Sequence, residues 1–234
     1  MSILAGILLV ALPVAFTVLF AVLGAIFDYR DVLRRPTTEV LAAFRAGGSR
    51  LVTVWWAFAM SAVLFAPVAV LVSSLLRAAD AALVATATVV GVLAALVQFL
   101  GLVRWPFLVP YLAREAEGAT PARSEAIDVV FQSFHRYLGV AVGEHLGYLF
   151  TGAWTVLVGV AVLHVGGPGW LGVPGIVIGA VLAACSLEFV GPSERSGWRI
   201  AGAVVPIAYL AWSAWLALFG VVVLLGLDSG TLAG

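Results

Sequence analysis

The chain has 234 residues, of which 63% are apolar and only 10% are charged. Soluble globular domains carry about a quarter charged residues, so this sequence lacks the polar surface that a soluble fold of its size needs. Its basic and acidic residues balance at twelve each, which leaves no net charge to attract nucleic acid. The composition therefore predicts an integral membrane protein whose surroundings are a lipid bilayer.

A series of long apolar segments runs along the chain. A bilayer core about 30 Å thick requires about 20 apolar residues in a helix. Six segments meet this requirement: 3–27, 51–76, 81–103, 138–163, 171–189 and 200–227. Backbone groups in lipid must be paired within their own segment, so each segment should be an α-helix. We expect an all-α helical bundle of about six transmembrane helices, which forms a single transmembrane domain over residues 1–234.

Two connections between these segments have helical patterns of their own. Residues 37–47 and 124–136 carry apolar side chains at helical spacing, which is typical of amphipathic helices at a membrane interface. Thr37 or Thr38 can provide the N-cap of the first helix, and Ser124 that of the second. The second helix should lie near the interface before it enters the fourth apolar segment.

Arginine is distributed unevenly between the connections. All twelve basic residues are Arg, and only Arg77 lies in a connection on the side opposite the others. The positive-inside rule assigns the Arg-rich side to the cytoplasm, so both termini should be outside. The lack of Lys, together with abundant Ala, Val, Gly and Arg, resembles the coding bias of GC-rich bacteria. We therefore expect a multi-pass protein of a bacterial cytoplasmic (plasma) membrane.

The fourth apolar segment has a face made of small residues. Gly139, Gly143 and Gly147 recur every four residues, so they lie on one side of a helix. Such faces allow another helix to approach closely. Packing against a neighbouring span is the favoured interpretation, and a homo-oligomer contact or the close approach of a ligand are the alternatives.

Glu144 lies in the same segment, about two turns inside the expected cytoplasmic boundary. An ionised carboxylate at that depth costs several kcal/mol unless it is paired, hydrated or protonated. Gln98 should lie at a similar depth, and Arg136 is the nearest cation along the chain. His145 follows Glu144 but points about 100° away on an α-helix. The candidate ligand-binding residues are Gln98, Arg104, His135, Arg136, Glu144, His145 and Tyr148.

Several functions are compatible with this cluster. A structural pair that holds two helices together would explain Glu144 without any ligand. The leading functional hypothesis is a protein that binds or moves a small solute or lipid, with Glu144 as its ionisable anchor. The alternatives are a non-catalytic scaffold or accessory subunit, and an intramembrane enzyme that uses Glu144 or His145 as general acid or base. Cys185 is the single cysteine and no HExxH motif is present, so we expect no metal and no cofactor.

Two stretches resemble a known family. They are residues 101–110, with the sequence GLVRWPFLVP, and residues 134–147, with the sequence FHRYLGVAVGEHLG. Both are similar to the bacterial membrane proteins grouped as domain of unknown function 4386, as are the chain length and the layout of six spans. The resemblance implies no activity, because that family is itself uncharacterised, but it falls on the two stretches that carry the candidate residues.

Overall fold

The computed structural model describes residues 2–29, 32 and 35–226 of the chain. All regular secondary structure in these residues is helical, and six helical segments are long and apolar enough to cross a membrane. The predicted all-α, multi-pass bundle is confirmed to that extent. In chain order the elements are α1 (Ser2–Phe27), α2 (Thr37–Val63), α3 (Phe65–Leu75), α4 (Ala81–Phe107), α5 (Val109–Glu115), α6 (Pro121–Phe134), η2 (His135–Leu146), α7 (Gly147–His164), α8 (Gly169–Cys185), η3 (Ser186–Phe189), η4 (Gly191–Ser193) and α9 (Arg199–Leu224).

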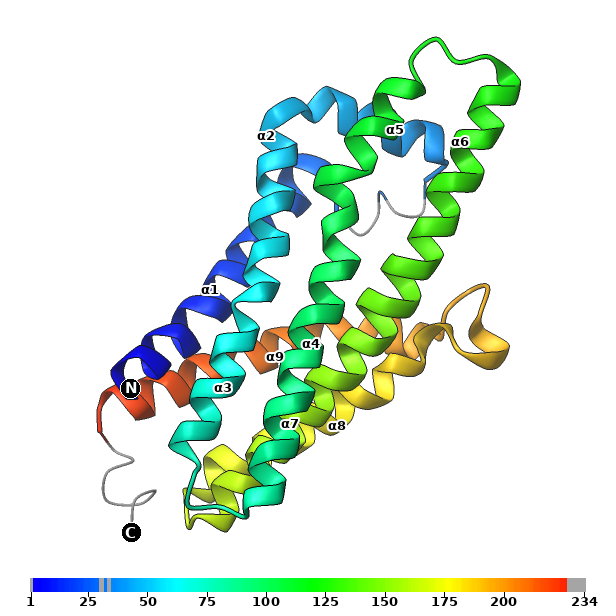
Figure 1. Cartoon of the computed structure of the whole chain (residues 1–234). Coiled ribbons are helices and arrows are strands. Elements are labelled where there is room, and N and C mark those ends of the chain that lie inside the picture. The colour runs from blue at the N-terminus through cyan, green and yellow to red at the C-terminus, as the bar shows by residue number, and fades with distance from the viewer. Residues whose placement is uncertain (1, 30–31, 33–34, 227–234) are drawn as a thin grey trace.

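Consecutive elements join into rods, and the longest rod consists of α6, η2 and α7. It has 44 residues, which at about 1.5 Å per residue is about 66 Å, or twice the thickness of a bilayer core. One end of this rod must therefore project beyond the membrane. Figure 1 shows α6 beside α5 and the first turns of α2, at the end of the bundle away from the N-terminus.

The second apolar segment differs from its expected shape at two places. The amphipathic stretch from residue 37 and the following span form one element, α2, which bends at Gly48 with φ 56° and ψ −153°. The span itself is interrupted at Leu64, where α2 ends and α3 begins. The reason is Pro67, which has no N–H for the carbonyl of Val63 but is tolerated in the first turn of a new helix.

The beginning of α2 is fixed to α6 by hydrogen bonds. The Thr37 hydroxyl donates to the Asp128 carboxylate, and Gln132 Nε2 donates to Thr37 Oγ1 at 3.0 Å. The N-cap position of α2 is Pro36, which makes no side-chain cap, so the predicted threonine cap is wrong. The hydroxyl of Thr37 is used for tertiary contact instead.

The start of α6 also lies earlier than expected. Its N-cap is Thr120, whose hydroxyl accepts a hydrogen bond from the backbone N–H of Arg123 at 3.4 Å. Pro121 occupies the first helical position, where its fixed φ suits the helix and its missing N–H costs nothing. Ser124 therefore lies inside the helix, and the prediction that it caps α6 is wrong.

Buried apolar side chains form two large clusters. One contains Trp154, Trp215 and Phe219, and the other contains Trp55 and Trp105. On α1, the buried residues of the first cluster end at Leu12, and those of the second cluster begin at Leu23. On α4, the first cluster ends at Ala95 and the second begins at Trp105. Between these limits, one side of each helix lines a cavity, with Phe16, Thr17 and Phe20 on α1 and Gln98, Gly101, Leu102 and Arg104 on α4.

Candidate functional site

A cavity of about 190 Å³ lies between the two apolar clusters, and we call it the inner cavity. Its walls come from α1, α2, α4, η2, α7 and α9, together with Tyr29, which lies just after α1. Its aromatic lining residues are Phe16, Phe20, Tyr29, Phe58, Tyr148 and Tyr209. Its lining residues with polar side chains are Thr17, Gln98, Arg104, Glu144, Tyr29, Tyr148, Tyr209 and Ser213.

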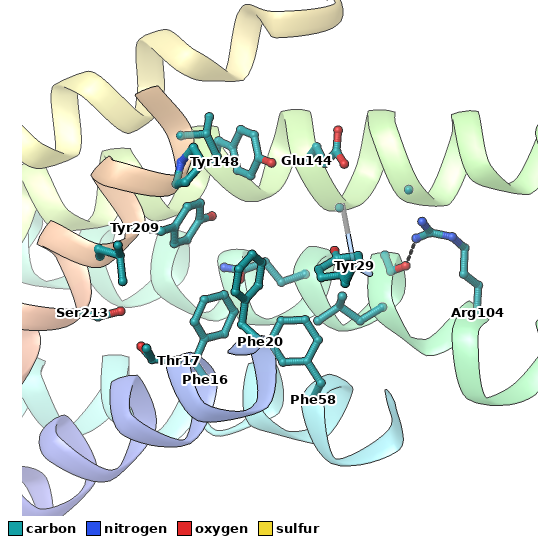
Figure 2. Close-up of a pocket in the computed structure, with 18 residues that line it drawn as sticks. Phe16, Thr17, Phe20, Tyr29, Phe58, Arg104, Glu144, Tyr148, Tyr209 and Ser213 are labelled. Atoms are coloured by element: carbon teal, nitrogen blue, oxygen red, sulfur yellow. Dashed lines mark hydrogen bonds between the residues drawn. The ribbon is translucent and has the colours of Figure 1, made fainter. Parts of the chain in front are cut away.

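The aromatic rings form a continuous lining. The Tyr148 ring meets the Tyr209 ring edge-on with 5.5 Å between centroids, and Tyr209 stacks on Phe16 at 5.9 Å. Phe16 in turn lies 5.0 Å from Phe58. These separations are those of favourable aromatic pairs. Figure 2 shows the row of rings between Ser213 at one end and Arg104 at the other.

A second, wider hollow of about 690 Å³ adjoins η2, and we call it the vestibule. Glu144 and Tyr148 line both the inner cavity and the vestibule. The vestibule residues with polar or ionisable side chains are Gln132, His135, Arg136, Glu144, His145, Tyr148, Ser186, Glu188, Glu194, Arg195 and Ser196. The two compartments therefore differ in character, one aromatic and one polar, and they meet at Glu144.

The local backbone explains this placement of Glu144. Residues 135–146 form a π-helix, η2, where the sequence predicted an α-helix. Its hydrogen bonds join residues five apart, so each turn holds more residues and successive side chains diverge by less than 100°. Glu144 and His145 accordingly both line the vestibule.

The small residues of the fourth segment pack against α4, as the sequence predicted. A Cβ atom on Gly101 would lie 2.5 Å from the Gly143 Cα, so the two backbones are in direct contact. A Cβ on Gly147 would lie 3.2 Å from Gln98 Cγ. The glycine face is thus used inside the chain, between α4 and the rod formed by η2 and α7.

Arg104 is the buried cation of the site, with only 9% of its surface exposed. Its Nη1 donates to the Gly101 carbonyl, and its Nη2 lies 3.3 Å from His135 Nδ1. Since guanidinium only donates, that imidazole nitrogen must accept the hydrogen bond. The guanidinium carbon also lies 5.3 Å from the centre of the Trp105 ring. Gly139 makes room for this group, because a Cβ there would lie 2.6 Å from Arg104 Nη2.

The threonine hydroxyls that follow Glu144 along the helix form hydrogen bonds with neighbouring helices. Gln98 Nε2 donates to Thr151 Oγ1 at 2.8 Å. Thr155 Oγ1 donates to the Thr151 carbonyl at 2.7 Å and accepts from Trp212 Nε1 at 2.9 Å. Thr151 and Thr155 therefore connect α7 to α4 and α9, deep inside the bundle, and hold Gln98 in one orientation.

The remaining candidates lie around the vestibule. Arg136 forms an ion pair with Glu194 at 2.9 Å, and both side chains are largely exposed. His145 Nδ1 lies 2.8 Å from the Ser186 carbonyl, to which it must donate. Arg136, the cation nearest to Glu144 along the chain, therefore has an ion-pair partner at the rim of the vestibule.

Comparison with known proteins places this structure in a family. The family model described as Domain of unknown function (DUF4386) matches residues 4–221. The chain belongs to this family. The resemblance predicted from residues 101–110 and 134–147 is confirmed. No curated protein and no solved structure matches the chain.

Sequence reasoning on this DUF4386 member missed the walls of the inner cavity that lie outside the third and fourth spans. They come from α1, α2 and α9, where apolar and aromatic residues resemble ordinary lipid-facing or packing positions. Two spacings offered a weak signal, because residues four apart lie on one helix face. The pairs concerned are Phe16 with Phe20 on α1, and Tyr209 with Ser213 on α9.

The described part of this DUF4386 chain offers no ready metal centre. Among residues 2–29, 32 and 35–226, no three His, Cys, Asp or Glu side chains converge to hold an ion. Cys185 is buried near the end of α8. What the site can do is surround a small molecule with aromatic rings while carrying one carboxylate and one guanidinium in its wall.

Proposed function

We propose that this DUF4386 protein binds or moves a small solute or lipid, with Glu144 as its ionisable anchor. The observation that carries the proposal is that Glu144 and Tyr148 line both the inner cavity and the vestibule. Any ligand that passes between the two compartments meets these side chains. A binding group at this position can hold a ligand in the inner cavity and can also contact it as it enters through the vestibule.

The cost of a carboxylate inside a span supports the same conclusion. Ionisable residues in transmembrane segments are rare, face the bundle interior or a hydrated cavity, and mark the pathways of substrates and ions. Glu144 is half-buried and belongs to a rod that is otherwise apolar enough to cross the bilayer. A carboxylate that only holds two helices together needs no cavity beside it. Glu144 borders both the inner cavity and the vestibule.

The alternatives receive less support from the contacts of the site. A scaffold that docks a partner helix on Gly139, Gly143 and Gly147 would have to displace α4, which already packs there. An enzyme needs a second reactive group beside Glu144. His145 lines the vestibule with Glu144, but its Nδ1 is hydrogen-bonded to the Ser186 carbonyl at 2.8 Å, which suits positioning better than catalysis.

We also propose that the chain lies in a bacterial cytoplasmic membrane, with α5 and α6 in the cytoplasm and both termini outside. Arginine content supports this orientation through the positive-inside rule.

Ala122 on α6 and Ala78 between α3 and α4 are both exposed. In a Cys185→Ala background, a membrane-impermeant maleimide added to whole cells should label Ala78→Cys. It should label Ala122→Cys only after the cells are opened, and the reverse pattern would invert the orientation.

Native mass spectrometry of the full chain, released gently from bacterial membranes, tests the proposed function. We expect wild type to carry a small molecule or lipid, and Glu144→Gln to have lost most of it. The matched control is Glu125→Gln, which removes an exposed carboxylate of α6 that lines neither the inner cavity nor the vestibule. Equal, unliganded masses for wild type and Glu144→Gln would leave the structural pair as the explanation.

A further inference from the structure

Ser213 carries the first indication of what the inner cavity holds. The residue is 8% exposed and lines the cavity, and its buried Oγ has no hydrogen-bond partner among the described residues. Serine hydroxyls in spans usually bond to a carbonyl of their own helix, as Ser73 does with Ala69 at 2.9 Å. A buried hydroxyl without a partner costs free energy. A ligand with a hydrogen-bonding group would satisfy it.

The rings between Ser213 and Glu144 indicate the sign of charge that the ligand carries. Six aromatic side chains line the cavity, and the faces of such rings are electronegative and attract cations. The carboxylate of Glu144 adds a formal negative charge to the same wall. A positively charged group at this position gains from both sources, and an anion is disfavoured by both.

Arg104 does not reverse this preference. Its guanidinium donates to the Gly101 carbonyl and to His135, and it lies over the Trp105 ring, which belongs to the second apolar cluster. Figure 2 shows it at the end of the row of rings opposite Ser213. The positive charge of Arg104 is thus held at one end of the cavity, whereas the rings occupy the middle.

The volume limits the size of the ligand. An apolar protein cavity of about 150 Å³ accommodates one benzene molecule, and the inner cavity measures about 190 Å³. It therefore holds one ring or a short chain, and the bulk of a phospholipid does not fit. Along α9 the lining runs from Val205 to Ser213, which is about 12 Å at about 1.5 Å per residue.

We propose that the inner cavity binds a small lipophilic amine. Its ammonium group lies at Glu144, its apolar body lies among the rings of Phe16, Phe58 and Tyr209, and a polar substituent at the far end reaches the Ser213 hydroxyl. This proposal rests on the proposed function and names the ligand class of the same site.

The test is calorimetric titration of the full chain in lipid nanodiscs with four probes of similar size. They are phenylethylamine, tyramine, phenylethanol and phenylpropionate, and empty nanodiscs correct for partition into lipid. Wild type should bind both amines at least about tenfold more tightly than the neutral and anionic probes, the factor typical of a close charge pair. This comparison needs no variant and so does not depend on the folding of any mutant.

Variants then assign the ends of the ligand. Glu144→Gln should weaken both amines about tenfold or more, while Glu125→Gln leaves them unchanged. Ser213→Ala should weaken tyramine about threefold to tenfold, the value of one neutral hydrogen bond, and leave phenylethylamine unaffected.

Three results would overturn the amine assignment: equal binding of the alcohol or the acid, no effect of Glu144→Gln on the amines, or no binding of any probe. The mass spectrometry described above separates this failure from that of the proposed function. A native adduct that depends on Glu144, without amine binding, leaves the function standing and the ligand class wrong. Absence of both adduct and binding refutes both.

Discussion

Gly101→Ala should destabilise the protein by about 2–3 kcal/mol, although the change adds a single methyl group. The new Cβ would lie 2.5 Å from the Cα and 3.2 Å from the N of Gly143, and 3.1 Å from the Leu138 carbonyl oxygen. All three are backbone atoms, so no side-chain rotation relieves the overlap and η2 must move away from α4. Overpacking of this kind typically costs about 1–3 kcal/mol, and the rigidity of the partner places it at the upper end. Thermal unfolding in nanodiscs measures the loss.

Gly24→Ala is the matched control for this change. Gly24 also lies inside a helix, and a Cβ there would meet nothing within 4 Å. The substitution should be neutral or stabilise the fold by up to about 1 kcal/mol, through the smaller backbone entropy of alanine in the unfolded chain. Because both variants exchange the same residue types in helices, their difference isolates the contact between α4 and η2. Similar unfolding temperatures for the two would mean that this contact is loose.

The six spans could be predicted because the bilayer imposes one requirement on every segment that crosses it. Each needs enough consecutive apolar residues and complete internal hydrogen bonding, and both are local properties of sequence. The glycine face of the fourth segment was predictable for the same reason, since spacing along one helix identifies it. Its partner, Gly101, was not, because the register between two antiparallel helices depends on how their surfaces fit together.

The geometry of the site depended on a backbone form that composition does not reveal. Residues 135–146 contain ordinary helix-forming residues together with Gly139 and Gly143, and nothing in them distinguishes a π-helix from an α-helix. This form adds residues to each turn, which lets Glu144 and His145 line the same vestibule. The angle between neighbouring side chains in this segment therefore could not be taken from α-helical spacing.

The aromatic half of the inner cavity was missed for another reason. Phe16, Phe58 and Tyr209 come from three helices that are far apart in the sequence, and they meet only in the folded bundle. Aromatic residues in apolar spans are most often packing residues, as Trp212 and Trp215 are here through hydrogen bonds to Thr155 and the Leu171 carbonyl. Sequence pattern does not separate the two uses.

The second large effect should come from Trp105, at the centre of the cluster beside the inner cavity. Trp105 is 1% exposed and stacks on Trp55 with 4.5 Å between ring centroids and an interplanar angle of 11°. Phe27 meets its edge at 5.6 Å. Phe44 also stacks on the ring at 6.0 Å between centroids, and the Arg104 guanidinium carbon lies 5.3 Å from its centre. Trp105→Ala should remove these contacts together and destabilise the fold by about 3 kcal/mol.

That magnitude follows from the surroundings of the side chain. Truncating a buried Trp typically costs about 3–5 kcal/mol in soluble proteins, where part of the loss is the transfer of apolar surface out of water. In a membrane protein the segment stays in lipid when tertiary structure is lost, so this transfer contributes little to the cost of truncation. The cost then comes from the cavity that is left and from the lost dispersion contacts. Trp56→Ala is the control, because Trp56 is the next residue to Trp55 on α2 but 50% exposed. It should change unfolding by less than about 0.5 kcal/mol.

The Trp105 variant also tests how the apolar cluster and the ligand site depend on each other. The Arg104 guanidinium donates to the Gly101 carbonyl and to His135 while it lies over the Trp105 ring. Without the ring, the guanidinium is free to swing toward the inner cavity and bring its charge nearer to Glu144. Amine binding should then weaken in Trp105→Ala but not in Trp56→Ala, measured below the unfolding temperature of both. Unchanged amine affinity in a folded Trp105→Ala protein would show that Gly101 and His135 suffice to hold the arginine at the end of the cavity.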